Sequence, residues 1–160
     1  MYRKGELIMQ VMLERISQLI QQLKDEATSL VNEVRELLKS LRLQRQNPGD
    51  GQKEKVRPLW LYLRERPGYD TVSIVWTQVI YYNKARNMPH YRDIARGRGY
   101  QISQSRFLRF ARAYHPEIQQ ELWAYEKTFA AIRYRQSLLS KARTALIQFQ
   151  KMAAKPTMED

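Results

Sequence analysis

The apolar positions in the first quarter of the chain recur at alternating spacings of four and three residues. This spacing lines them up along one side of an α-helix and leaves polar residues on the other sides. It predicts a long amphipathic helix over about 6–45, within a first segment 1–46. The seam consists of Met9, Leu13, Ile16, Ile20, Leu23, Ala27, Leu30, Val34, Leu37 and Leu41. So long a seam needs a partner, either another helix of the same chain or a second copy in a coiled coil.

The apolar period changes to two after a linker at 47–55, which contains helix breakers and turn formers. Leucines at 59, 61 and 63 alternate with aromatic and basic residues, which predicts a strand with one buried face. A turn at 67–70 and a stretch rich in β-branched and aromatic residues at 71–82 predict a second strand and a hairpin. A polar loop at 83–89 and a short third strand at 90–96 complete a small antiparallel sheet.

Helical spacing returns in the last third of the chain. Ser103 or Ser105 is suited to cap a short helix through 107–111. Pro116 suits the first turn of a second long helix, whose apolar stripe runs from Ile118 to Phe149. The sequence therefore predicts an α+β fold in four parts: the helix in 1–46, the linker 47–55, a β-rich unit with a short helix at 56–114, and a long helix at 115–153.

The charge of the chain gives a first indication of what the protein binds. Twenty-eight Lys and Arg residues against sixteen Asp and Glu give a net charge of +12, which favours a polyanionic partner. The middle unit, 56–114, carries eleven basic and three acidic residues, so it holds a net +8. All of these basic residues except Lys84 are arginines, whose planar fork pairs with phosphate oxygens and guanine edges.

The candidate nucleic-acid-binding residues are drawn from this middle unit. They are Arg64, Arg66, Lys84, Arg86, Arg92, Arg96, Arg98, Arg106, Arg109 and Arg112, with Trp60, Tyr62, Gly97 and Gly99. Two aromatic residues and two arginines at 60–66 share one face of the first strand, where they can stack on bases or pack against the fold. Trp76 and Trp123 are expected in the core.

The stretch IARGRGY at 94–100 is the most distinctive local pattern. Gly97 and Gly99 let the backbone turn closely, and Arg96 and Arg98 can then project toward a phosphate. The spacing does not match a Walker loop or a dinucleotide fingerprint. An anion clamp and an ordinary charged loop both fit the pattern.

Catalytic chemistry finds little support in the residue types present. The chain has no cysteine, and its two histidines, His90 and His115, lie apart without ligand spacing, so neither a metal site nor a cofactor is expected. The few carboxylates of the middle unit do not suggest a magnesium nuclease. Charges interrupt the apolar N-terminal run, so neither a signal peptide nor a membrane span is expected. The sequence predicts a non-enzymatic cytoplasmic protein.

Four short motifs, in this order, resemble the MobI family of auxiliary mobilisation proteins from integrative conjugative elements and A/C-type conjugative plasmids. They are SIVW at 73–76, GRGY at 97–100, a Ser-x-Phe helix start at 105–107 and AAIRYR at 130–135. The resemblance spans about 56–150 and leaves the N-terminal helix outside. It implies a bacterial, non-catalytic factor that acts at the origin of transfer and assists the relaxase and other transfer proteins.

Two other classes of function remain open from the residues alone. One is a helical assembly protein whose basic surface meets an acidic partner, and the other is an RNA-binding subunit of a ribonucleoprotein. A homodimer formed through the long helices is favoured over packing of the two helices within one chain. A dimer suits palindromic or repeated DNA sites.

Overall fold

The computed structural model describes residues 2–45, 57–68, 70–83, 85 and 88–154. The elements follow in the order α1 (Tyr2–Arg45), β1 (Leu59–Glu65), β2 (Val72–Asn83), β3 (Met88–Asp93), α2 (Gln104–Phe110) and α3 (Pro116–Ala153). The α+β prediction is confirmed, with two long helices and a three-stranded antiparallel sheet. The linker predicted at 47–55 lies outside the described residues, and the division of the chain into four parts stays a prediction.

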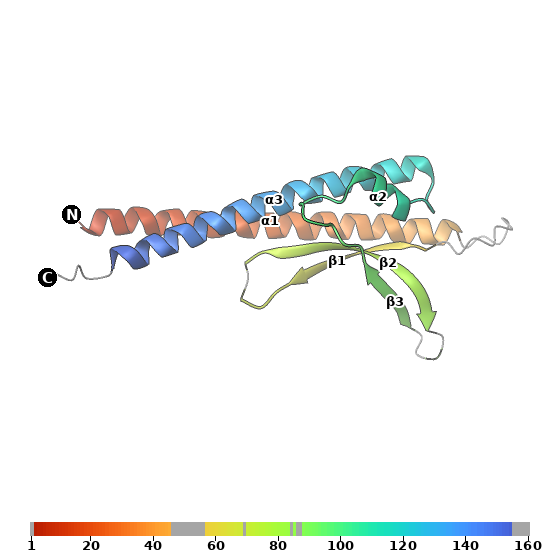
Figure 1. Ribbon diagram of the computed structural model, residues 1–160, viewed down its shortest axis with the longest axis horizontal. Helices are drawn as coiled ribbons and strands as arrows, with labels where there is room; N and C mark the ends of the chain where they lie inside the picture. Colours follow the sequence, from red (N-terminus) through yellow and green to blue (C-terminus); the bar gives the residue numbers. More distant parts are fainter. Residues whose placement is uncertain (1, 46–56, 69, 84, 86–87, 155–160) are drawn as a thin grey trace.

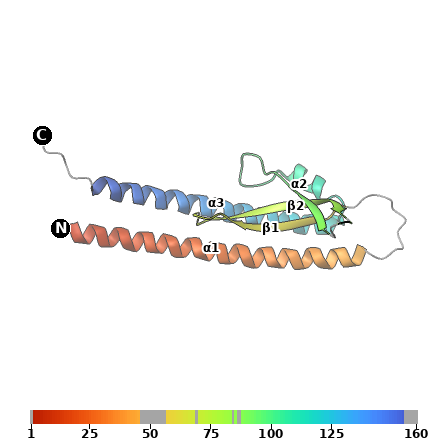
Figure 2. The ribbon, with the colours of Figure 1, turned by 90° about the horizontal axis from the view of Figure 1, so that it is seen from below.

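The two long helices run antiparallel along each other, so that both chain ends lie at the same end of the pair (Figures 1 and 2). Packing within one chain therefore covers the predicted seam of α1. Ile20, Leu23 and Ala27 are buried there, and Ala27 is fully inaccessible. A small residue at this position lets the two helices approach closely.

The buried stripe of α1 widens beyond Ala27. Val31 and Leu38 are buried although they lie outside the predicted seam, whereas Leu30 and Leu37 inside it are only half-buried. The physical reason is that this half of α1 has two neighbours, because both α3 and the sheet pack against it (Figure 1). Two neighbours at different angles need a broader apolar surface than one seam supplies.

The sheet has the strand order β1-β2-β3, and both pairs are antiparallel. Leu59 pairs with Gln78 and Glu65 with Val72, so the predicted hairpin is confirmed. The third strand spans Met88–Asp93, so it begins two residues earlier and ends three residues earlier than the predicted 90–96. The β2–β3 pairing shifts register between Val79 and Tyr81.

The core forms where the inner sheet face meets the helices. Trp76 of β2 lies at its centre, 1% exposed, with ring centroids 5.1 Å from Phe107 of α2 and 6.0 Å from Phe129 of α3. Trp123 also packs against Phe107, with ring centroids 5.6 Å apart. Both tryptophans are buried, which confirms their predicted place in the core.

The starts of the last two helices agree with the sequence signals. Ser103 occupies the N-cap position of α2, and its backbone carbonyl accepts a hydrogen bond from Phe107 N–H at 2.9 Å. Its hydroxyl makes no capping bond. Pro116 lies in the first turn of α3, directly after His115 at the N-cap. A proline is tolerated there because its missing N–H has no partner within the helix.

Candidate nucleic-acid interface

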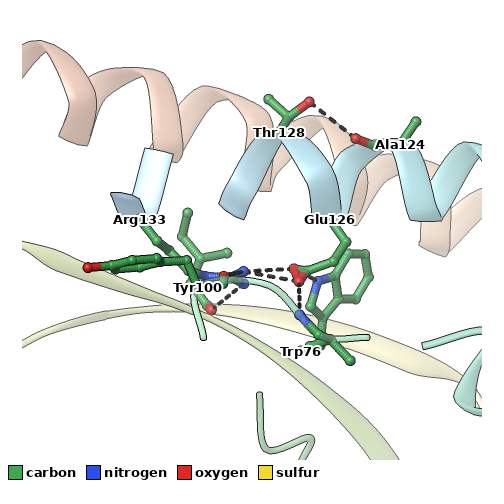
Figure 3. A network of polar contacts seen from close by, with 8 residues as sticks. Trp76, Tyr100, Ala124, Glu126, Thr128 and Arg133 are labelled. Carbon is green, nitrogen blue, oxygen red and sulfur yellow. Dashed lines mark hydrogen bonds and ion pairs between the residues drawn. The ribbon is translucent and has the colours of Figure 1, made fainter. Parts of the chain in front are cut away.

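A buried polar network fixes the loop at 94–100, which we call the basic loop, onto the core (Figure 3). The carboxylate of Glu126 on α3 is fully inaccessible and accepts hydrogen bonds from Trp76 Nε1 and from Ile102 N–H, both at 3.0 Å. Arg133, one heptad further along α3, places its Nη1 2.9 Å from Glu126 Oε1. A buried carboxylate is costly unless it is paired in this way.

The guanidinium of Arg133 also reaches two other parts of the chain. It donates to the backbone carbonyl of Tyr100 at 2.8 Å and to that of Ile74 at 3.0 Å. Burial lowers the pKa of Arg133, Glu126 opposes that shift, and the charge of Arg96 lowers the pKa further. One arginine thus holds α3, strand β2 and the loop before α2 together, which gives the loop a defined position.

Three arginines meet around a cavity of about 170 Å³ between the sheet and α2, which we call the basic cavity. Arg57 precedes β1, Arg92 lies on β3 and Arg106 on α2; Gln78, Asp93, Ile94, Ala95 and Phe110 complete the lining. Two of the three, Arg92 and Arg106, belong to the predicted set. The fold therefore gathers positive charge from three separate segments.

Asp93, the acidic residue in this lining, is already bonded elsewhere. Its two oxygens accept from the Nη1 and Nη2 atoms of Arg64 at 2.7 and 2.9 Å, a bidentate pair with both side chains about half exposed. Hydrogen bonding to Asp93 raises the pKa of Arg64. Arg64 is thus paired within the fold. The carboxylate of Asp93 is bonded to Arg64 and not to the arginines of the basic cavity.

The outer face of β1 is also engaged in packing. The Arg35 guanidinium of α1 lies 5.8 Å from the ring centroid of Trp60, and its Nε donates to the Leu61 carbonyl at 2.8 Å. Tyr62 packs edge-on against Tyr91 at 5.5 Å. Burial, followed by the proximity of Tyr91, raises the pKa of Tyr62. Both aromatic residues are half-buried, so packing against the fold accounts for these positions.

The loop at 94–100 separates its two arginines and its two glycines. Gly97 has a φ of +82°, which favours glycine, but Gly99 does not lie in the left-handed region. Arg96 lines a second cavity, described below, whereas Arg98 is exposed and lies outside that lining. Arg96 and Arg98 therefore do not share the lining of that cavity, and the anion clamp stays a prediction.

The remaining predicted residues are distributed as follows. Arg66, Arg98, Arg109 and Arg112 are exposed. Lys84 and Arg86 lie outside the described residues. Over the described ranges, the structure holds no group of three or more histidine or acidic side chains able to bind a metal ion. None of the helices in those ranges has a stretch long and apolar enough to cross a membrane.

Comparison with known protein families adds an observation that the geometry alone does not give. The family model described as MobI protein matches residues 23–147. The chain belongs to the MobI family. The match extends further toward the N-terminus than the motifs suggested, because it includes the second half of α1. The chain has no match among curated proteins or among solved structures.

The motifs that suggested the MobI family converge in the core of the fold. Each motif contributes one residue to this core. Trp76 is the last residue of SIVW, Tyr100 of GRGY and Phe107 of the Ser-x-Phe motif, and Arg133 lies within AAIRYR. Trp76 packs against Phe107, and both Trp76 and Arg133 bond to Glu126, while Arg133 also bonds to Tyr100 O. These MobI motifs therefore build the framework that positions the basic residues.

Three polar residues of this MobI framework were not among the predicted site residues. They are Glu126, Arg133 and Gln136, each at most 6% exposed. With Leu122 and Phe129 they follow a four-three spacing along α3. The signal that identifies them is a polar side chain at an apolar seam position, since such positions need a paired partner when buried.

Proposed function

We propose that this MobI protein is a non-catalytic DNA-binding accessory factor that acts at the origin of transfer and assists the relaxase. Membership of a mobilisation-related accessory family supports the setting. The observation that carries the DNA-binding part is the basic cavity. There Arg57, Arg92 and Arg106 surround one space whose carboxylate, Asp93, is bonded to Arg64.

Phosphate groups match this arrangement chemically. Arginine donors pair with phosphate oxygens in a fixed fork, and each neutralised phosphate releases condensed counterions. Arg98, Arg109 and Arg112 are exposed on the loop, on α2 and just after α2, and they add positive charge outside the cavity lining. The affinity for duplex DNA should therefore fall steeply with salt, with a slope of about −0.9 in log K against log salt for each contact.

The test is fluorescence anisotropy with an origin-of-transfer duplex between about 50 and 200 mM salt, the range over which such contacts weaken strongly. The double variant Arg92→Gln/Arg106→Gln should bind more weakly, and its salt slope should be shallower by about 2. Arg15→Gln/Lys127→Gln is the charge-matched control, because these exposed residues lie on α1 and α3 away from the cavity. Equal losses for both double variants would show that net charge alone drives binding.

Competition at fixed salt separates the other classes of function. A scrambled duplex and a structured RNA compete with the labelled duplex, and preference for the origin duplex is the expected result. Preference for RNA would favour a ribonucleoprotein role. Absence of nucleic-acid binding would favour an assembly protein, and either result would overturn the DNA-binding proposal.

The proposal includes a homodimer that forms through the free end of the helix pair. The sheet lies along the other half of the pair (Figure 1). Exposed apolar residues occur near the start of α1 and the end of α3. They include Leu7, Ile8, Val11, Phe149 and Met152, each at least 60% exposed. Apolar surface of this kind marks interaction sites. In light scattering, the double variant Val11→Glu/Phe149→Glu should have the mass of a monomer. The control Ser17→Glu should keep the mass of a dimer. A monomeric mass for the wild-type protein would refute the dimer.

A further inference from the structure

A second cavity, which we call the Arg96 cavity, opens where β2, the basic loop and the middle of α3 meet. Its volume is about 360 Å³, within the range of small-molecule sites. Three cationic side chains line it, Arg96 from the loop and Arg133 and Lys141 from α3, and no acidic side chain does so among the described residues. Asp70, next to the lining, is paired with Arg143. The cavity is therefore strongly positive.

Hydroxyl groups give this cavity hydrogen-bond donors beside the charges. Ser73, Ser137 and Ser140 all belong to its lining. The Tyr100 hydroxyl donates to Ser137 Oγ at 2.9 Å. Because Ser137 accepts that bond, its own proton remains available for an acceptor inside the cavity. Cations and hydroxyl donors together are the groups that bind phosphate oxygens.

Two buried donors in the lining lack a hydrogen-bond partner among the described residues. Gln136 is 3% exposed, and its Oε1 accepts from Val72 N–H at 3.2 Å, which fixes the orientation of the amide. The amide nitrogen Nε2 is left unpaired, as is Nε of Arg133. Buried donors are almost always paired in folded proteins, so these two unsatisfied nitrogens favour a negative group nearby, although their own surfaces are closed to direct contact with it.

The charge balance in the network leads to the same conclusion. Glu126 compensates Arg133 but is fully used, since it also accepts from Trp76 and Ile102. The charges of Arg96 and Lys141 have no carboxylate in the lining to offset them. Burial is the main cause of the lowered pKa of Arg133, and the charge of Arg96 lowers that pKa further. An anion held between these cations would relieve the repulsion.

We propose that the Arg96 cavity binds the phosphate group of a phosphate ester. Arg96 and Lys141 pair with its oxygens, the hydroxyls of Ser137 and Ser140 donate to them, and Arg133 and Gln136 supply positive potential from beneath. The ester is either a free nucleotide or a phosphate of bound DNA. The DNA source rests on the proposed function. Consecutive residues of one loop line the two cavities, because Ile94 and Ala95 line the basic cavity and the next residue, Arg96, lines this one.

The test is calorimetry on the whole chain with inorganic phosphate, thymidine 5′-monophosphate and thymidine as probes, at constant ionic strength held with chloride. The two phosphate-bearing probes should bind and thymidine should not. Arg96→Gln or Lys141→Gln should each weaken binding about tenfold, as expected for a charge-assisted contact. Arg98→Gln is the matched control, because Arg98 lies in the same loop outside the lining. An equal loss for Arg98→Gln, or undetectable phosphate binding, overturns the proposal.

A second variant tests the buried donors without removing a structural bond. Gln136→Glu keeps an oxygen for Val72 N–H but places a carboxylate beneath the cavity, so phosphate binding should be lost while the circular dichroism spectrum is retained. Unchanged phosphate affinity in a folded Gln136→Glu protein overturns the assigned position of the site.

Competition identifies the source of the phosphate. If the origin-of-transfer duplex displaces the monophosphate from wild type, the bound group is a DNA phosphate; if the duplex does not, the ligand is a free nucleotide. Both results support the phosphate site. A protein that binds the monophosphate but not DNA would refute the proposed function and leave the phosphate site standing. A protein that binds DNA but not the monophosphate would refute the phosphate site and leave the proposed function standing.

Discussion

Replacing Arg133 by methionine should destabilise the protein strongly, because the substitution leaves the Glu126 carboxylate buried without its ionic partner. Arg133 is 6% exposed and Glu126 is fully inaccessible. Breaking a buried pair by removing one partner costs about 3–5 kcal/mol. The two remaining donors to Glu126, Trp76 Nε1 and Ile102 N–H, reduce this cost, whereas the carbonyls of Ile74 and Tyr100 lose a donor. These opposing effects leave the expected cost at about 3–5 kcal/mol.

The expected loss is large compared with the whole stability of a domain, which is about 5–15 kcal/mol. For a chain of this size, each kcal/mol shifts Tm by about 2–4 °C, so Arg133→Met should lower Tm by roughly 6–20 °C. Urea unfolding followed by tryptophan fluorescence measures the free energy directly. Arg135→Met is the matched control: Arg135 is exposed on the same helix, and its replacement should stay within about 0.5 kcal/mol.

A double-mutant cycle separates the ion pair from general loss of packing. Glu126→Gln removes the charge but keeps one oxygen as an acceptor. If the two residues act as a pair, the double variant should be less destabilised than the sum of the single variants by about 0.5–3 kcal/mol. A loss below about 1 kcal/mol for Arg133→Met, or strictly additive effects, would refute the reasoning that this pair holds the loop and the sheet to α3.

Three further predictions concern other parts of the fold. Ala27→Leu should cost about 1–3 kcal/mol in urea unfolding, because Ala27 is fully inaccessible where the helices meet. Gly97→Ala should destabilise by about 1 kcal/mol in thermal unfolding because of its φ of +82°, whereas Gly99→Ala, with only ordinary contacts at a new Cβ, should be nearly neutral. Arg64→Ala should cost at most about 1 kcal/mol, and the cost should shrink in high salt, because its bond to Asp93 is about half exposed.

Much of the fold could be predicted because its elements carry strong local periodicity. The alternation from Leu59 to Leu63 identified the buried face of β1, and Pro116 marked the start of α3. The widened stripe of α1 at Val31 and Leu38 could not be predicted in the same way. It depends on where the sheet docks, and a sequence period reports one contact direction at a time.

The candidate site was predicted in composition better than in arrangement. Charge density marks the middle unit as the arginine-rich part of the sequence, yet Arg64 is bonded to Asp93 within the fold. Arg57 joins Arg92 and Arg106 although it was outside the predicted set. Such groupings arise from contacts between residues far apart in the chain, so no local spacing reveals them.

The two kinds of arginine in this protein follow different physical rules. Arg133 is buried, so its charge must be satisfied by Glu126 and by two carbonyls, and it can be replaced only at a large cost in stability. Arg92 is exposed, and its charge can be removed at little cost to the fold. A substitution that weakens DNA binding without lowering Tm therefore reports on the surface. A substitution that lowers both the DNA affinity and Tm reports on the buried network beneath the surface. The stability of every arginine variant therefore has to be measured together with its DNA affinity.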